Sequence, residues 1–183
     1  PADLTQIKES AALATKISQK MGGIDILVNN AGTNIPQDSL DVTEEAWDTI
    51  MNINLQAAFF LAQAIGRVMI DQGRGGRIIN ISSQTGSVAL AKRAAYCASK
   101  AGLNLLTKVL AMDWATHEIL VNAVAPTFIE TEMTKPFLAD AEFRQYALAK
   151  NMLKRFGTPD DVAGAVLYLA SPAANLVTGH ILY

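Results

Sequence analysis

The amino-acid sequence predicts an α/β fold in which helices cover both faces of a parallel sheet. Short apolar runs alternate with longer segments of helical periodicity, the order expected of parallel strands joined by helical crossovers. Small and polar residues follow each of these runs, as they do at the carboxyl edge of such a sheet. Because no repeat, low-complexity tract or linker divides the 183 residues, we expect one domain over residues 1–183.

The N-terminal part is predicted to form a helix, a strand and a second helix. Apolar residues recur at helical spacing over 5–21, with Thr5 as the N-cap. The apolar run 24–28 is typical of a buried strand. A long helix, which a bend could interrupt, is expected over 43–70, and the glycine-rich residues 73–76 end it.

The rest of the chain continues the alternation of strand and helix. Thr158 and Pro159 form a typical helix start, with a capping threonine before a proline in the first turn. The predicted elements are a strand at 77–81, a polar loop at 82–93, a helix at 95–115, a strand at 119–123, a looser segment with some helix at 126–153, a helix at 159–170 and a strand at 179–183.

Composition excludes several functional classes. With 15 basic and 17 acidic residues and a net charge of −2, the chain lacks the basic surplus of a nucleic-acid-binding protein. No apolar run approaches the roughly 20 residues that span a bilayer, so no membrane partner is expected. The single Cys97 fits a reducing compartment. The two histidines have no metal-binding spacing, so no metal is expected.

Tyr96 and Lys100 give the sharpest chemical signal. They lie four residues apart near the start of a predicted helix, and therefore on one face of it. The pKa of a free tyrosine is about 10, and a nearby ammonium group and helix N-terminus would lower it. The phenol could then exchange a proton with an alcohol or a carbonyl. A chance pairing of a surface tyrosine with a surface lysine is the alternative.

Two further polar residues add context to this pair. Ser83 lies in the polar loop before Tyr96, where its hydroxyl could hydrogen-bond the same substrate oxygen. Asn54 lies inside the predicted helix 43–70, although asparagine is a mediocre helix former. It is either a satisfied polar residue between helices or a group that orients a water or the backbone near Lys100.

In this order and spacing, the motifs resemble those of the short-chain dehydrogenase/reductase family. They are residues 29–32 (Asn-Asn-Ala-Gly), Asn54-Leu55, Ser83, Tyr96-x-x-x-Lys100 and residues 122–126 (Asn-Ala-Val-Ala-Pro). The resemblance covers the whole chain and is greatest to the classical branch, which includes 3-oxoacyl-carrier-protein reductases and sugar or polyol dehydrogenases. It implies a Rossmann-like, doubly wound sheet and an NAD(P)-dependent oxidoreductase that interconverts a secondary alcohol and a ketone by hydride transfer.

The resemblance implies a role for each catalytic residue. Tyr96 would be the general acid/base, and Lys100 would lower its pKa and hydrogen-bond the nicotinamide ribose. Ser83 would position the substrate oxygen. Asn54 would hold a water in a proton relay through Lys100.

The resemblance also implies contacts with a dinucleotide, NAD or NADP. The Asp3 carboxylate would accept a hydrogen bond from the adenine amino group, and the small residues of the 29–32 turn would allow the cofactor a close approach. The implied cofactor-binding residues are Asp3, Leu4, Asn30, Ala31, Gly32, Tyr96, Lys100, Pro126, Thr127, Ile129 and Thr131.

The sequence departs from the family pattern in two respects. Thr127 follows Pro126 where the family usually has glycine, which places a side chain near the nicotinamide. The family's N-terminal βαβ part with its glycine-rich turn is missing, as is its closing segment, so the resemblance implies truncation at both ends. Residues 73–76 cannot replace that turn because they precede a strand. The strand at 24–28 would then form a bare apolar edge.

Three residues bear on the substrate. Lys92, Arg93 and Gln84 lie in the implied substrate loop, where the two cations could attract an anion such as an aldonate or a phosphopantetheine group. The alternative is that Lys92 and Arg93 are simply two solvated charges of a surface loop and bind no anion. The two cations and Gln84 favour a sugar or polyol substrate. The alternative function is that of a 3-oxoacyl-carrier-protein reductase. Residues 133–148, with several aromatic side chains, would form a mobile apolar lid.

A different class of function stays open, namely a non-catalytic scaffold or a fragment that cannot bind cofactor alone. The absent glycine-rich turn favours this alternative, whereas the intact Asn54, Ser83, Tyr96 and Lys100 set argues against it. The resemblance further implies a cytoplasmic homo-oligomer, a dimer or tetramer formed through the helices around 43–71 and 95–115.

Overall fold

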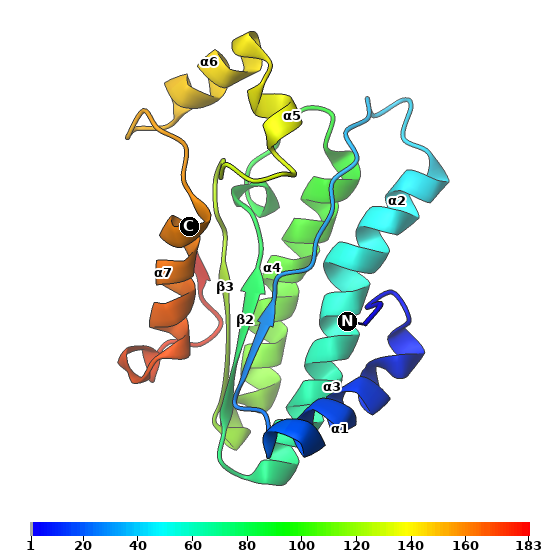
Figure 1. Ribbon diagram of the computed structural model, residues 1–183, viewed down its shortest axis with the longest axis vertical. Coiled ribbons are helices and arrows are strands. Elements are labelled where there is room, and N and C mark those ends of the chain that lie inside the picture. Colours follow the sequence, from blue (N-terminus) through cyan, green and yellow to red (C-terminus); the bar gives the residue numbers. More distant parts are fainter. Residues whose placement is uncertain (1) are drawn as a thin grey trace.

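The structure is a computed structural model, and it describes residues 2–183. Its centre is a four-stranded, wholly parallel sheet in the order β1-β2-β3-β4, with helices on both faces (Figure 1). The predicted parallel α/β fold is therefore confirmed. The strands are β1 (Ile26–Asn29), β2 (Gly76–Ile81), β3 (Ile119–Val124) and β4 (Ile181–Leu182).

Three long helices, α1, α3 and α4, cover one face, and α7 covers the other (Figure 1). Neighbouring residues of β2 show the two faces, because side chains alternate along a strand. Ile78 packs among residues of α3 and α4, whereas Ile79 packs with Leu169 of α7. The bounds are α1 (Ser10–Met21), α3 (Ala57–Gln72), α4 (Ala94–Trp114) and α7 (Pro159–Ala170).

The helix predicted over 43–70 is continuous from Glu44 to Gln72. It consists of α2 (Glu44–Met51), a π-helical turn η2 (Asn52–Gln56) and α3. The Thr43 hydroxyl caps its start by accepting a hydrogen bond of 3.2 Å from the Ala46 N–H. Its 29 residues and mean hydropathy of 1.4 in the most apolar window reach the length and composition of a membrane span, contrary to the sequence-based expectation. In this structure the helix packs against α1, α4 and the sheet.

The remaining elements are short. Thr5 does not cap the first helix as predicted, since its amide and hydroxyl bond the Asp3 carboxylate and a 3₁₀ turn precedes α1. The looser segment contains two helices, which lie beyond the carboxyl ends of the strands in Figure 1. The two helices are α5 (Lys135–Leu138) and α6 (Ala141–Lys150). The 3₁₀ turns of the chain are η1 (Ile7–Glu9), η3 (Gln84–Gly86), η4 (Ala115–His117) and η5 (Pro172–Ala174).

Strand β1 lies at the edge of the sheet. Ile26 and Val28 are 48% and 41% exposed, while Leu27 between them packs against the core. The expectation of a buried strand is therefore wrong for Ile26 and Val28. Helix α7, which covers the other face of the sheet, packs on β2 and β3 and leaves these two side chains exposed. The expected apolar edge is present.

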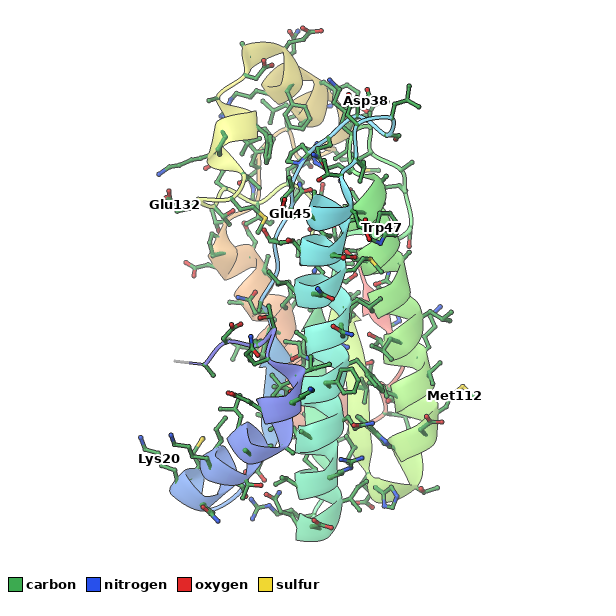
Figure 2. All side chains as sticks on the ribbon, turned by 90° about the vertical axis from the view of Figure 1, so that its right-hand side faces the viewer. Lys20, Asp38, Glu45, Trp47, Met112 and Glu132 are labelled. Atoms are coloured by element: carbon green, nitrogen blue, oxygen red, sulfur yellow. The ribbon has the colours of Figure 1, made fainter. Side chains whose placement is uncertain are left out.

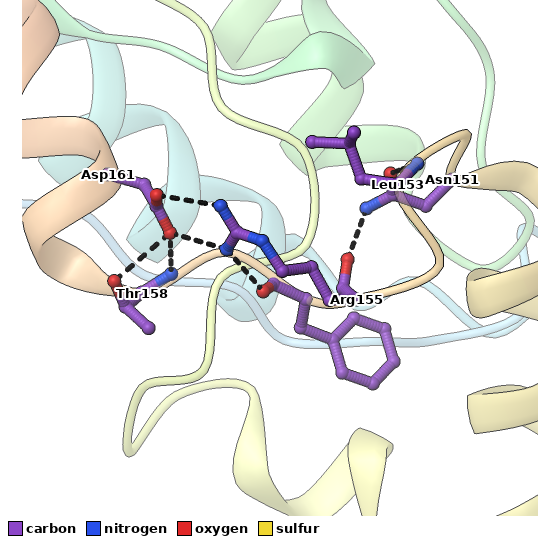
Figure 3. Close-up of polar contacts among 6 residues, drawn as sticks. Asn151, Leu153, Arg155, Thr158 and Asp161 are labelled. Carbon is purple, nitrogen blue, oxygen red and sulfur yellow. Dashed lines mark hydrogen bonds and ion pairs between the residues drawn. The ribbon is translucent and has the colours of Figure 1, made fainter.

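Polar contacts fix the start of α7 (Figure 3). The Asp161 carboxylate accepts a hydrogen bond of 2.8 Å from the Thr158 N–H, and Arg155 donates to both carboxylate oxygens at 2.8 and 2.9 Å. Arg155 in turn is tied to the preceding loop, since its carbonyl accepts a hydrogen bond from the Asn151 amide. This capping box confirms Thr158 as the N-cap and joins the segment after α6 to α7.

Candidate active site

A cleft opens at the carboxyl ends of the strands, where the sequence predicted a site. Ser83 follows β2, Pro126 and Thr127 follow β3, and Tyr96 and Lys100 enter from α4. The structure thus brings together most of the predicted residues. Those lining the cleft are Asn30, Gly32, Ser83, Tyr96, Lys100, Pro126, Thr127, Ile129 and Thr131.

Three predicted cofactor-binding residues do not line this cleft. The exposed Asp3 carboxylate accepts hydrogen bonds from the Thr5 N–H at 3.0 Å and hydroxyl at 2.7 Å, and these bonds lower its pKa. Leu4 packs against the hydrophobic core beside α1 and α3. Ala31 is exposed. Of the implied cofactor-binding residues, Asp3, Leu4 and Ala31 therefore lie outside the lining of this cleft, and their contacts with a cofactor stay a prediction.

Ser83 is held by Thr85, a residue that the sequence reasoning missed. The Ser83 hydroxyl oxygen accepts hydrogen bonds from the Thr85 amide at 3.2 Å and the Thr85 hydroxyl at 2.9 Å. Because both lone pairs are used, the Ser83 proton is left to donate to another group. A serine two residues before a threonine at a strand end is a local capping pattern that could have revealed this pair.

The pKa of Tyr96 shifts upward, opposite to the lowering that the sequence predicted. Burial raises its pKa above the usual value, and this effect exceeds the lowering by the hydrogen bond with Ser83 and the charge of Arg93. The ammonium of Lys100 lies 5.8 Å from the centroid of the ring, but it is not among the groups that lower the Tyr96 pKa. In this structure the phenol is therefore protonated at neutral pH.

Lys100 is a buried cation in the wall of the cleft. Its side-chain nitrogen donates a hydrogen bond of 2.8 Å to the Ile81 carbonyl, and burial lowers its pKa to about 8. An ammonium group has three donors, so two remain for groups that enter the cleft. Gly32 lies directly beside it, since a Cβ there would be 3.7 Å from the lysine nitrogen.

Asn54 lies behind the cleft, in the π-helical turn η2. Its side-chain oxygen accepts from the Thr33 N–H at 2.8 Å, and its amide donates to the Thr33 carbonyl at 2.9 Å and the Ser99 hydroxyl at 3.1 Å. Asn54 thus joins the loop after β1 to α4 and orients the backbone beside Gly32. The relay water stays a prediction. π-Helical turns are frequent at functional sites.

A side pocket adjoins the cleft and shares Ser83, Tyr96 and Thr127 with it. Gln84 and Arg93 line the side pocket, as predicted for the substrate loop, whereas Lys92 is exposed and lines neither space. Asn34, which the sequence reasoning missed, also lines it. The expected lid contributes Phe137, Leu138 and Phe143 from α5 and α6, but Tyr146 is exposed.

Two other sequence-based expectations concern glycines and metals. Residues 73–75 precede β2 and Gly76 begins it, at the opposite end of the sheet from the cleft, so these residues cannot line the cleft. Within residues 2–183, no group of three histidine, cysteine, aspartate or glutamate side chains could hold a metal ion. Cys97 is half-buried and has no disulfide partner, because it is the one cysteine of the chain.

Comparison with known proteins identifies the family. A family model described as "Enoyl-(Acyl carrier protein) reductase" matches residues 1–183. Over 181 residues the chain is 38% identical to 2-dehydro-3-deoxy-D-gluconate 5-dehydrogenase of Dickeya dadantii, covering 99% of this chain and 72% of that protein. Over 182 residues it is 44% identical to 3-oxoacyl-acyl-carrier-protein reductase FabG of Thermotoga maritima, covering 98% and 71%.

Solved structures agree with this result. A gluconate 5-dehydrogenase of Burkholderia cenocepacia, in complex with NADP and tartrate, superposes with a TM-score of 0.96 at 35% identity, covering 99% of this chain and 71% of that one. The fold, the ordered motifs and the matches over the whole chain lead to one assignment. The chain belongs to the short-chain dehydrogenase/reductase family of NAD(P)-dependent oxidoreductases, in its classical branch.

Proposed function

We propose that this protein interconverts a secondary alcohol and a ketone with NAD or NADP, and that Tyr96 transfers the proton. One observation carries the proposal: Ser83, from the loop after β2, and Tyr96 and Lys100, from α4, line one cleft at the carboxyl ends of β2 and β3. Ligands of open α/β sheets bind at this edge. A cofactor such as NAD or NADP supplies or accepts the hydride, and the protein supplies orientation and proton transfer.

The cleft fits the nicotinamide end of such a cofactor. Lys100 has two free donors for ribose hydroxyls, and Gly32 leaves room where a side chain would approach within 3.3 Å of Asn54. Pro126, Thr127, Ile129 and Thr131 form the rest of the wall, which suits a ring and its amide.

Two hydroxyls would act on the substrate oxygen. Ser83, whose oxygen already accepts twice from Thr85, donates a hydrogen bond to that oxygen and holds it beside Tyr96. Tyr96 gives its proton to the alkoxide that develops during ketone reduction, and it takes a proton during alcohol oxidation. Because burial keeps the pKa of Tyr96 high, the protonated form that reduction requires predominates at neutral pH.

The substrate class that we propose is a sugar, a polyol or a related small hydroxylated compound. Support comes from the polar Gln84, Arg93 and Asn34 in the side pocket, and from similarity to named sugar and polyol dehydrogenases. Reduction of a 3-oxoacyl thioester is the second candidate, which the 44% identity to FabG of Thermotoga maritima favours. We further propose a homo-oligomer that works in the cytoplasm.

The Tyr96→Phe variant tests the proton-transfer role. Turnover should fall by at least about 100-fold, the contribution typical of a general acid or base. The affinity for NAD or NADP in calorimetry should change little, because the ring is kept. Tyr146→Phe is the matched control, since Tyr146 is exposed and lines neither space. Undiminished turnover in Tyr96→Phe would refute the role.

A substrate panel separates the candidates. The purified full-length protein should oxidise alditols or aldonates with NAD or NADP, and it should reduce a 3-oxoacyl thioester far more slowly. Turnover of the thioester alone would establish the second candidate. A protein that binds neither dinucleotide and turns over no panel member would be the non-catalytic scaffold.

A further inference from the structure

Arg93 is a buried cation without an acidic partner. Arg93 directly precedes α4, is 9% exposed and lines the side pocket together with Tyr96 of that helix. Among residues 2–183, the ion pairs do not include Arg93. Its guanidinium donates a hydrogen bond of 3.1 Å to the neighbouring Lys92 carbonyl and lies 4.7 Å from the centroid of the Phe137 ring.

Burying such a charge is costly unless an anion balances it. The hydrogen bond to a carbonyl and the contact with Phe137 use little of a guanidinium group, which has five N–H donors in a planar fork. That fork matches the two oxygens of a carboxylate. The geometry therefore leaves donors for an anionic group that enters the side pocket.

Asn34 adds an independent polar group to the same pocket. Its side-chain oxygen is buried and has no hydrogen-bond partner among residues 2–183. Buried polar atoms in proteins are almost always paired with protein, ligand or water, so this oxygen is free to accept a hydrogen bond from a group that enters the pocket. A substrate hydroxyl would supply one. The pocket thus offers a cation and a hydrogen-bonding amide beside Ser83 and Tyr96.

We infer that Arg93 binds the carboxylate of a sugar-acid substrate, an aldonate or its keto form, while Asn34 binds one of its hydroxyls. The inference rests on the proposed function and narrows its substrate class. Arg93 lines the same side pocket as Tyr96, the predicted acid/base, which suits a carboxylate a few carbons from the reacting carbon. The phosphate of a phosphopantetheine arm is separated from its thioester by a long chain and does not suit this position.

Paired substrates and one variant test the role of Arg93. D-gluconate and D-glucitol share a carbon skeleton and differ in the carboxylate, and other aldonate and alditol pairs extend the comparison. In Arg93→Met, kcat/KM for the aldonates should fall by about 10- to 100-fold, mainly through KM, which is the range for a charge-assisted hydrogen bond. The values for alditols should stay within about threefold, and Arg93→Lys should keep part of the preference for aldonates.

Lys92→Met is the matched control, because Lys92 is the adjacent cation but is exposed and outside the pocket. It should leave both substrate types unchanged. An equal loss for aldonates and alditols in Arg93→Met would show a structural role instead and overturn the inference. The inference would also be overturned if the wild type preferred alditols and Arg93→Met changed neither kcat/KM value. A wild type that turns over neither substrate type but reduces a 3-oxoacyl thioester would establish the second candidate and overturn the inference, and one that turns over none of the three would refute the proposed function itself.

Discussion

At the scale of single residues, the orientation of the Ser83 hydroxyl depends on Thr85. The Thr85 amide and hydroxyl both donate to the Ser83 oxygen, so the serine proton has only the cleft left to point into. Thr85 is itself buried, which holds the pair in place. A positioning residue of this kind acts through its neighbour and does not touch the substrate.

The Thr85→Val variant removes the side-chain donor and keeps the shape. One of the two bonds that orient Ser83 is then lost, so kcat should fall by about 3- to 10-fold with little change in KM. Steady-state kinetics on the preferred substrate measure the effect. Thr15→Val, on the exposed side of α1, should have no effect. An unchanged kcat in Thr85→Val would show that Ser83 needs no such support.

Lys100 makes the stability of the cofactor-free protein depend on pH. Its pKa is about 8 in the folded protein, against the ordinary lysine value of 10.5 that applies to the unfolded chain. Between these values the unfolded chain binds more protons, so the contribution of Lys100 to the free energy of unfolding rises with pH.

The variant Lys100→Met isolates this contribution. The free energy of unfolding of the wild type, relative to Lys100→Met, should increase between pH 8 and 10.5 by at most about 3 kcal/mol. Urea denaturation at a series of pH values measures it. A flat or falling difference over that range would show that Lys100 is not desolvated.

At the scale of elements, the turn η3 is seated tightly on α4. A Cβ on Gly86 would lie 2.9 Å from the Lys100 carbonyl oxygen and closer still to the Asn104 amide. Backbone atoms of a helix cannot give way cheaply, so the turn would have to move. That turn contains Thr85 and directly follows Ser83. The packing of Gly86 against α4 therefore helps to fix the position of Ser83 in the cleft.

Gly86→Ala should therefore lower both stability and activity. Overpacking of this kind costs about 1–3 kcal/mol, and the displaced Ser83 should reduce kcat. Gly164→Ala in α7 is the control, since nothing lies within 4 Å of its added Cβ and alanine favours a helix. Thermal melting and kinetics on both variants check the prediction, which fails if Gly86→Ala behaves like Gly164→Ala.

At the scale of the whole molecule, an exposed apolar stripe runs along α4. Leu105, Val109 and Met112 are 65%, 45% and 79% exposed and lie on one side of the helix, at positions i, i+4 and i+7. Figure 2 shows Met112 pointing away from the body of the protein, with Trp47 of α2 near the start of α4. Contiguous apolar surface of this kind is typical of an interface, which agrees with the proposed homo-oligomer.

Charge on this stripe should dissociate the oligomer. The double variant Leu105→Glu, Met112→Glu would bury two carboxylates in the interface, so a dimer or tetramer should become a monomer in sedimentation velocity. Leu176→Glu is the control, because Leu176 is fully exposed and is not part of α4. A wild-type protein that sediments as a monomer, or a double variant that keeps its assembly, contradicts the prediction.

The sequence alone predicted the order of strands and helices and the group of residues at one sheet edge. Those features depend on local periodicity and on spacing, as in the Tyr96–Lys100 pair, and both are visible along the chain. The same signals overestimated the burial of β1, which neighbouring elements decide, and misplaced the first N-cap, because Thr5 bonds the Asp3 carboxylate and a 3₁₀ turn precedes α1.

Only the tertiary structure separated Arg93 from Lys92, placed Asn34 in the side pocket, and reversed the expected direction of the Tyr96 pKa. The physical reason is desolvation. Whether a charge or phenol loses its water depends on segments far away in the chain, such as α5 with Phe137, that fold over it. The residues of the cleft could therefore be predicted from the sequence, whereas their electrostatic state is decided by the fold.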